Sequence, residues 1–250
     1  MKITYIHHSS FAVELESAVF LFDYCEGPLP EFPADKTLFV LASHFHGDHF
    51  SPVIFELAEQ REMETNQGGR AGGQTGAIRY ILSKDIGVKR VPEKYRDLVC
   101  FVKAGAQLEL ASGAGPAGCL ETFKSTDEGV AFWITWEGKE IYHAGDLNNW
   151  WWEGEDKAWN HNMAANYKRE MEKMAGRHAD AAFVPLDPRQ EQWFYLGMQG
   201  FMEKVDAKCV FPMHFWKDYS IIEAMKKHPA SEGFRDRIMT ICREGEEFIL

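Results

Sequence analysis

Positive charge is scarce in this sequence, and its cysteines form no pattern that predicts disulfides. The 250 residues include 27 Lys plus Arg against 38 Asp plus Glu, which gives a net charge of −11 at pH 7 with histidine neutral. Proteins that bind nucleic acids rely on clustered Lys and Arg, so we expect no nucleic-acid partner. The five cysteines are odd in number and scattered without a CxxC pair, which is typical of reduced thiols in the cytoplasm.

The sequence also lacks segments that place a protein in a membrane. No stretch approaches the ~20 uninterrupted apolar residues of a membrane span. The N-terminal Met1–Tyr5 has neither the basic nor the apolar block of a signal peptide. The Gly-rich segment Asn66–Gly76 is not followed by Gly-Lys-Ser/Thr, which argues against a phosphate-binding loop for nucleotides. We therefore expect a cytoplasmic protein that acts on a small molecule, and the oligomeric state stays open.

The order of expected strands and helices favours two sheets between layers of helices. No linker, repeat or composition break divides the chain, so residues 1–250 are predicted to form a single domain of the α+β class. Strands are expected at Ile3–Ile6, Phe11–Leu15, Ala18–Phe22, Thr37–Ala42, Ile78–Ser83, Val99–Val102, Leu108–Leu110, Val130–Trp136, Glu140–Ala144, Ala181–Pro185, Lys208–Pro212 and Ile238–Cys242. Helices are expected after Ser51 and at Asn162–Ala175, Leu196–Val205 and Tyr219–Lys227.

The segment Ser43–His49 carries the strongest chemical signal. It reads Ser-His-Phe-His-Gly-Asp-His and follows an apolar run that is typical of a buried strand. Side-chain direction repeats every two residues in an extended segment, so His44 and His46 project to one side and can bind one metal together. Asp48 and His49 lie past a glycine turn and can face a second metal. Neutral nitrogen and anionic oxygen donors are the mixture that Zn, Mn and Fe sites use.

Three later positions offer a ligand-type residue where a strand is expected to end. These residues are Asp127, Asp146 and His214. Each is weak evidence alone, because an Asp after a strand is usually a turn or N-cap residue. Together with the histidine segment they form a coherent set of metal ligands.

This set resembles the metallo-β-lactamase fold of binuclear metal hydrolases, and the resemblance covers nearly the whole chain. The opening segment Tyr5–Phe11 is similar to the branch of ascorbate-6-phosphate lactonase-like enzymes. The resemblance implies a four-layer αββα sandwich with the metals at one edge. It also implies a division of ligands: His44 and His46 bind the first metal, Asp48, His49 and His214 bind the second, and Asp146 bridges the two.

One ligand of the family pattern is missing here. The family usually places a His between the first motif and the Gly-Asp segment, but no His stands between His49 and His143. Asp127 lies where that His is expected and is the natural substitute, with Glu128 as the alternative. A carboxylate there shifts the preference from Zn towards Mn or Fe. We expect two divalent metal ions, with Zn favoured and Mn or Fe as alternatives, unless only the second site fills.

Two cations about 3.5–4 Å apart can share a water and lower its pKa towards neutrality. The sequence therefore predicts an enzyme, a metal-dependent hydrolase whose metal-bridged hydroxide attacks a small ester, lactone or phosphoester, and an anionic substrate fits the hypothesis. Asp48 and Asp146 are the predicted catalytic residues, with Asp48 orienting the nucleophile. The alternatives are a phosphodiesterase or nuclease of the same fold, a di-iron redox enzyme, and a non-catalytic scaffold that metal stabilises.

Five further residues are candidate substrate contacts. His7 and His8 flank a strand end, and His143 directly precedes the Ala-Gly-Asp segment. Trp150 belongs to a run of three tryptophans, and aromatic side chains are common in ligand pockets. Arg189 follows an expected strand, and its planar fork suits a carboxylate or phosphate. The alternative for each is a packing role in the core or, for Arg189, a place in a surface turn.

Overall fold

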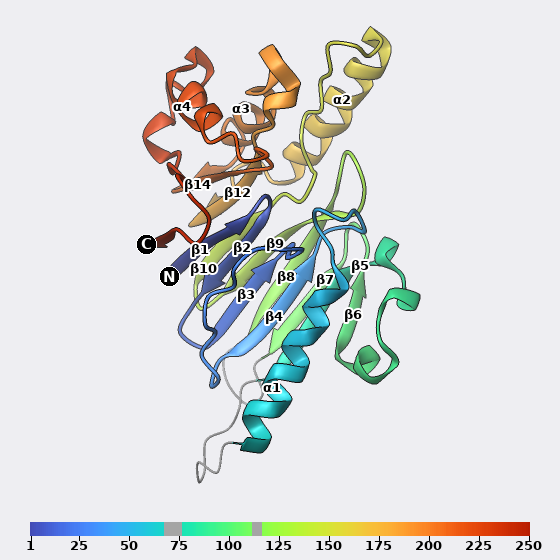
Figure 1. The fold of residues 1–250 in the computed structure, drawn as a ribbon. Helices are drawn as coiled ribbons and strands as arrows, with labels where there is room; N and C mark the ends of the chain where they lie inside the picture. Colours follow the sequence, from blue (N-terminus) through green and yellow to red (C-terminus); the bar gives the residue numbers. More distant parts are fainter. Residues whose placement is uncertain (68–76, 112–116) are drawn as a thin grey trace.

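The computed structural model describes residues 1–67, 77–111 and 117–250, which form two β-sheets with helices on their outer sides (Figure 1). The first sheet has the strand order β15-β1-β2-β3-β4-β5-β6. Its strands are β1 (Lys2–His7), β2 (Ser10–Glu14), β3 (Ala18–Phe22), β4 (Thr37–Ala42), β5 (Ile78–Ser83), β6 (Val99–Val102) and β15 (Glu247–Ile249).

The second sheet has the order β14-β12-β10-β9-β8-β7. Its strands are β7 (Gln107–Ala111), β8 (Ala117–Lys124), β9 (Val130–Trp136), β10 (Lys139–His143), β12 (Ala181–Pro185) and β14 (Val210–Met213), and the short β11 (His178–Ala179) pairs with β13 (Asp206–Ala207). The α-helices are α1 (Glu56–Gln67), α2 (Lys157–Lys173), α3 (Leu196–Met202) and α4 (Ser220–Lys227). The 3-10 helices are Pro52–Phe55, Lys84–Ile86, Val88–Arg90, Glu93–Leu98, Pro188–Trp193, Pro229–Ser231 and Arg235–Arg237.

Each sheet combines antiparallel hairpins with parallel strands. In the first sheet β1, β2 and β3 are antiparallel, whereas β3, β4, β5 and β6 run parallel. In the second sheet β10, β12 and β14 run parallel. Every residue of β3 and β4 is buried, because other parts of the protein cover both faces of the sheet there. This burial explains their apolar sequences.

Two apolar layers hold these elements together. The larger layer lies between the sheets, where the rings of Phe11 and Phe183 approach to 4.5 Å, and it continues under α2, α3 and α4. The smaller layer lies on the outer face of the first sheet, where α1 and the 3-10 helix before it cover residues such as Val40 and Tyr80. Figure 1 shows α1 in front of the sandwich beside β4, with α2, α3 and α4 gathered at the end of the molecule where β12 and β14 lie. The layers are therefore helix, sheet, sheet, helix, as the resemblance predicted.

The carboxyl ends of several strands from both sheets meet at one edge of the sandwich. Parallel strands deliver the residues that follow them to the same edge, which is where ligands bind in many open sheets. The segments that reach this edge follow β1, β3, β4, β10, β12 and β14 and begin with His8, Asp23, Ser43, Ala144, Leu186 and His214. The turn between β8 and β9, which contains Asp127, joins them.

The expected strand at Ile238–Cys242 is wrong. Ile238 makes only an isolated parallel bridge to Val210, and the chain then turns away. The backbone N–H of Cys242 donates to a carboxylate oxygen of Glu246 at 2.6 Å, and this contact closes the turn. The final strand β15 forms beyond the turn and pairs with β1.

Most of the Gly-rich segment Asn66–Gly76 lies outside the described residues. Asn66 and Gln67 are the last residues of α1. None of the helices in the described ranges combines the length and the hydropathy that crossing a bilayer requires.

Candidate metal centre

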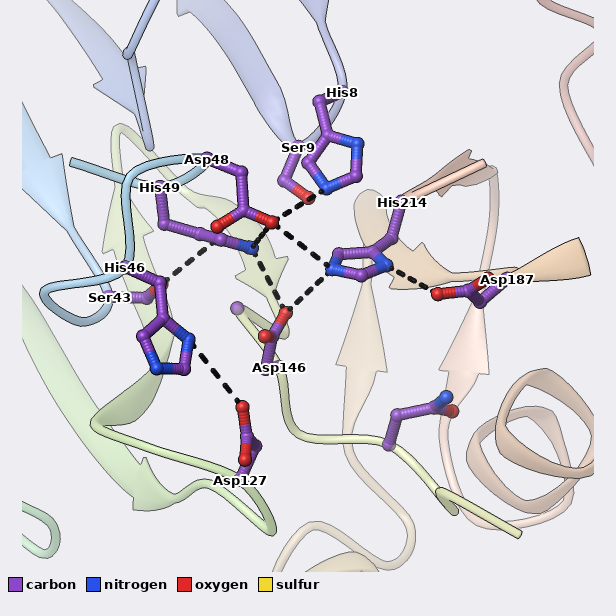
Figure 2. Close-up of polar contacts among 12 residues, drawn as sticks. His8, Ser9, Ser43, His46, Asp48, His49, Asp127, Asp146, Asp187 and His214 are labelled. Atoms are coloured by element: carbon purple, nitrogen blue, oxygen red, sulfur yellow. Dashed lines mark hydrogen bonds and ion pairs between the residues drawn. The ribbon is translucent and has the colours of Figure 1, made fainter. Parts of the chain in front are cut away.

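The first group of donors consists of His44, His46, Asp127 and Asp146, whose ligand atoms lie within 4.8 Å of one another. His44 Nε2 is 3.0 Å from His46 Nδ1 and 3.4 Å from Asp146 Oδ2. His46 Nδ1 is 3.7 Å from Asp127 Oδ2 (Figure 2). Donors about 2.0–2.2 Å from a tetrahedral ion are about 3.3–3.6 Å apart, so these separations suit one cation.

The second group consists of His8, Asp48, His49 and His214, again within 4.8 Å of one another. Asp48 Oδ2 lies 3.4 Å from His8 Nε2 and 3.9 Å from the Nε2 atoms of both His49 and His214. Figure 2 shows the three imidazoles converging on this oxygen from β1, the histidine segment and β14. The histidines of the second group are deeply buried, with side chains at most 4% exposed. In the first group, the side chains of His46 and Asp127 are 39% and 46% exposed.

Asp146 lies between the two groups and faces both. Its Oδ2 is 3.4 Å from His44 Nε2, whereas its Oδ1 is 3.2 Å from His49 Nε2 and 3.5 Å from His214 Nε2. One carboxylate therefore offers one oxygen to each group, which is the geometry of a ligand shared by two neighbouring cations.

The donor atoms have few partners within the protein. His8 Nε2, His49 Nε2 and Asp146 Oδ1 are buried and make no hydrogen bond among the described residues. Buried polar atoms nearly always have a partner, so three such atoms beside one another need an explanation. Imidazole nitrogens and a carboxylate oxygen are the donors of Zn, Mn and Fe sites, and the arrangement fits such a cation.

Two glycines let the chain segments approach closely enough to build the first group. A Cβ on Gly129 would lie 1.9 Å from the Ser43 carbonyl oxygen, and one on Gly145 would lie 2.6 Å from Ser43 Cβ. Both glycines also have positive φ angles, of 70° and 50°. The close approach sets Asp127 and Asp146 beside His44.

Asp23 is a fully buried carboxylate that orients the histidine segment without belonging to either donor group. Its Oδ1 accepts a hydrogen bond from the Ser43 backbone N–H at 2.7 Å. Its Oδ2 accepts from the Ser43 hydroxyl and from His49 Nδ1, each at 2.7 Å. A proton on Nδ1 leaves Nε2 of His49 free to bind a metal, so Asp23 selects the tautomer that the site needs.

Asp187 plays the same part for His214. Its Oδ2 lies 2.9 Å from His214 Nδ1, and its carboxylate also receives hydrogen bonds from the Arg189 guanidinium. Burial opposes ionisation of Asp187, but the hydrogen bonds from His214 and Arg189 lower its pKa to about 2. Asp187 therefore stays anionic at neutral pH and holds the His214 ring in place.

Burial and neighbouring charges favour the metal-binding forms of His8, His44 and Asp146. Burial lowers the pKa of His8 and of His44 to about 4, so both are neutral at pH 7. Burial opposes ionisation of Asp146, yet the nearby His49 and His214 hold the pKa of that carboxyl well below its ordinary value. Asp127 differs, because burial and the Asp146 charge raise its pKa. A cation beside Asp127 would offset both effects.

An aromatic cleft of about 340 Å³ opens beside the two donor groups. The rings of Trp150 and Trp152 are stacked with centroids 5.7 Å apart. The Arg189 guanidinium lies 4.7 Å from the Trp216 ring centroid. The residues that line the cleft are His46, Asp48, Asp127, Asp146, Trp150, Trp152, Trp159, Met163, Arg189, His214 and Trp216.

The structure brings the seven sequence-predicted metal ligands together at this edge, in the two groups given above. Asp127 reaches the first group, whereas Glu128 belongs to neither group. Trp150 and Arg189 line the cleft, and their contact with a substrate stays a prediction. His8 lies with the second donor group rather than among the lining residues of the cleft.

Two of the candidate substrate contacts lie elsewhere, which corrects the expectation for them. His7 points away from the cleft, and its two ring nitrogens face Glu26 at 2.9 Å and Glu244 at 2.8 Å. His143 is fully buried and stacks on Phe22. Its ring nitrogens face the Ser9 carbonyl and the Gly145 N–H, so His143 packs within the core and is not among the residues that line the cleft.

Sequence reasoning missed Asp23, Asp187 and Trp216. Both aspartates follow expected strands, and that position was the available signal, but an isolated Asp after a strand reads as a turn residue. Trp216 lies two residues after His214 with a positive φ of 49°, which turns its ring towards His8 and the cleft. No sequence pattern indicated that turn.

Comparisons with known proteins bear on the fold and on the chemistry. No family model matches the chain. A UPF0173 metal-dependent hydrolase from Cereibacter sphaeroides is 28% identical over 161 residues, which are 59% of this chain. A second relative with that name, from another strain of the species, is 29% identical over the same length. The alignments span 64% of the length of these curated relatives.

Solved structures with similar folds include three that cover nearly all of this chain. The metallo-β-lactamase fold protein YhfI from Bacillus subtilis has a TM-score of 0.56 at 12% identity and covers 99% of both chains. Igni18, a metallo hydrolase from Ignicoccus hospitalis, has a TM-score of 0.53 at 19% identity and covers 100% of this chain and 98% of its own. CmlA, a diiron β-hydroxylase from Streptomyces venezuelae, has a TM-score of 0.62 at 11% identity and covers 100% of this chain and 54% of its own.

This chain therefore has the metallo-β-lactamase fold, and the fold predicted by resemblance is confirmed. The ascorbate-6-phosphate lactonase-like branch stays a prediction.

Proposed function

We propose that this chain is a hydrolase with a binuclear metal centre that acts on a small ester, lactone or phosphoester. The observation that carries the proposal is the position of Asp146, with one oxygen towards each donor group. The relatives named metal-dependent hydrolases support the reaction class. The chemistry of the donors supports Zn, with Mn or Fe as alternatives because of the carboxylate of Asp127.

Bound divalent cations would activate water and stabilise negative charge that develops on the substrate. The protein's own groups hold the donors in place for this chemistry. Asp23 and Asp187 each contact the Nδ1 atom of His49 and of His214, which directs the Nε2 atoms of both rings towards Asp146 as the metal-binding atoms. Asp48 borders the cleft. Burial opposes its ionisation, but the facing His8 and His49 hold the pKa of its carboxyl below the ordinary value, so it is ionised and can orient an attacking water.

The cleft walls favour a substrate that carries a flat or apolar group. Four tryptophans and Met163 supply most of the apolar lining. Arg189 is the only Lys or Arg among the described residues that line the cleft, but its Nε and Nη2 are already hydrogen-bonded to Asp187. A substrate anion would have to share this guanidinium, so we propose that recognition rests chiefly on the aromatic walls.

Metal analysis combined with a substrate panel tests the proposal. The purified chain should contain two divalent metal ions and should hydrolyse some members of a panel of aryl esters, lactones and aryl phosphodiesters. His46→Ala and Asp146→Ala should each lose metal and at least 100-fold in rate. His178→Ala is the matched control, because the His178 side chain is half-exposed and its Nδ1 lies 3.3 Å from the exposed carboxylate of Asp206. Full activity in folded, metal-free protein would contradict the proposal.

Oxidation at a di-iron centre is the second candidate function, and two observations favour it. The structural neighbour CmlA is a diiron β-hydroxylase with the highest TM-score among those given above. The first donor group pairs two histidines with two carboxylates, a donor set that non-haem iron uses. Iron-loaded protein that consumes oxygen with a substrate, while the zinc form hydrolyses nothing, would favour oxidation over hydrolysis.

A further inference from the structure

His8 has a backbone conformation that directs its side chain into the protein. It lies between β1 and β2 with a φ of 47°, in the left-handed region that most side chains avoid. The register of the β1–β2 pair shifts between Tyr5 and His7, just before this residue. The side chains of the two neighbouring histidines therefore point in different directions. His7 faces Glu26 and Glu244, whereas His8 points inward and is 3% exposed.

The surroundings of His8 consist of the second donor group and one tryptophan. Its ring centroid lies 4.2 Å from that of His214 and 4.3 Å from that of Trp216. The backbone N–H of His214 donates to the His8 carbonyl oxygen at 3.3 Å, which ties the two segments together. This packing holds the ring in one position.

The Nε2 atom of His8 has no hydrogen-bond partner among the described residues. Asp48 Oδ2 is 3.4 Å away, but the pair does not have the geometry of a hydrogen bond. A residue that served only to orient Asp48 would be expected to donate to it. A separation of 3.4 Å is instead within the range expected for two donor atoms that bind one ion.

We propose that His8 is a direct ligand of the cation held by Asp48, His49 and His214. This inference rests on the metal centre of the proposed function and goes beyond the ligand set that the family resemblance implies. With Asp146 Oδ1, five protein donors would then surround the ion and leave no position for water or substrate. Such closed sets are typical of sites that retain their metal, whereas catalytic sites keep a position for water or substrate.

The two groups therefore differ in their tasks. In the first group, the side chains of His46 and Asp127 are 39% and 46% exposed and border the cleft. In the second group, Asp48 and His214 border the cleft, but His8 and His49 are buried and do not. We expect the second group to bind its cation tightly and permanently, and the first group to hold an exchangeable cation beside the substrate.

Cobalt titration of metal-free protein tests this assignment. Wild-type protein should bind two Co²⁺ ions with different affinities, and His46→Ala should weaken only the looser one. His8→Asn should weaken the tighter site at least tenfold and change the visible spectrum of the first equivalent. Asn is chosen because it tolerates a positive φ but is too short to reach the other donors. His178→Ala should behave as wild type.

X-ray absorption of wild-type protein with one Co²⁺ per chain gives a second measurement that needs no variant. It should count three imidazoles on the metal, from His8, His49 and His214. Two imidazoles, or unchanged affinity and spectrum in His8→Asn, would overturn the proposal and leave His8 as a packing residue. Wild-type protein that binds no Co²⁺ would refute the proposed metal centre itself, so the two failures are distinguishable.

Discussion

Replacing Asp23 with Asn alters one atom in a buried network that lies outside both donor groups. The carboxylate accepts hydrogen bonds from the Ser43 N–H, the Ser43 hydroxyl and His49 Nδ1. An Asn side chain offers only one acceptor oxygen. If its NH₂ faces the Ser43 N–H, two donors oppose each other, so we expect the NH₂ to face His49 instead.

In that orientation His49 must accept at Nδ1 and move its proton to Nε2. Nε2 is the atom that lies 3.2 Å from Asp146 Oδ1, and a protonated nitrogen cannot bind a metal. Loss of such an outer hydrogen bond typically weakens metal affinity by about 10–100-fold, or roughly 1.4–2.7 kcal/mol. If the network does not rearrange, the opposed donors instead cost the fold about 1–3 kcal/mol.

Two measurements separate these results: competition for Zn²⁺ with a chromophoric chelator, and thermal unfolding of the metal-free protein. Asp206→Asn is the control, because that side chain is 73% exposed and remote from the donors. If Asp23→Asn binds zinc as tightly as wild type and unfolds at the same temperature, Asp23 does not set the protonation of His49, and the reasoning is wrong.

Four other outcomes are expected. Gly129→Ala should lower the free energy of unfolding by more than about 3 kcal/mol in denaturant titrations, because its Cβ would meet the Ser43 carbonyl oxygen at 1.9 Å. Gly138 has the same φ of 70° but open space around it, so Gly138→Ala should lower the free energy of unfolding by only about 1 kcal/mol. Burial opposes protonation of His49, but the carboxylates of Asp146 and Asp23 raise its pKa well above 6.5. Calorimetry at pH 7 in buffers of different ionisation enthalpy should therefore detect proton release when metal binds. The same raised pKa stabilises the metal-free fold below pH 6.5, and that contribution is lost as the pH rises through the folded-state pKa. Trp152→Ala should raise KM about tenfold for an aryl substrate and change kcat little, and equal effects on a methyl ester would argue against aromatic recognition.

The sequence was most informative where residue type and spacing coincide. His44, His46, Asp48 and His49 lie within six residues after an apolar strand, so local geometry alone predicted how they divide. The strands Ala18–Phe22, Thr37–Ala42, Val130–Trp136 and Ala181–Pro185 also have the predicted bounds, because largely buried strands have long apolar sequences.

The sequence was least informative where a role depends on contacts between distant segments. His8 is one of two adjacent histidines, and only the left-handed turn before β2 decides which of them points inward. Asp23 and Asp187 acquire their roles from histidines in other segments, which no local pattern shows. The strand predicted at Ile238–Cys242 failed for a related reason, because pairing with β1 instead occurs at Glu247–Ile249.

The donor atoms come from chain segments that are far apart, from His8 near the start to His214 near the end. Bringing such segments together from the unfolded chain costs conformational entropy. A cross-link between them reduces this cost, because it restricts the unfolded chain. The five cysteines are free thiols, so no covalent bond among the described residues supplies such a link. Bound cations would act as reversible cross-links that join the two sheets at one edge. Removal of the metals by a chelator should therefore lower the stability of the sandwich as well as its activity. Unfolding should then start where β1, β4, β10 and β14 end.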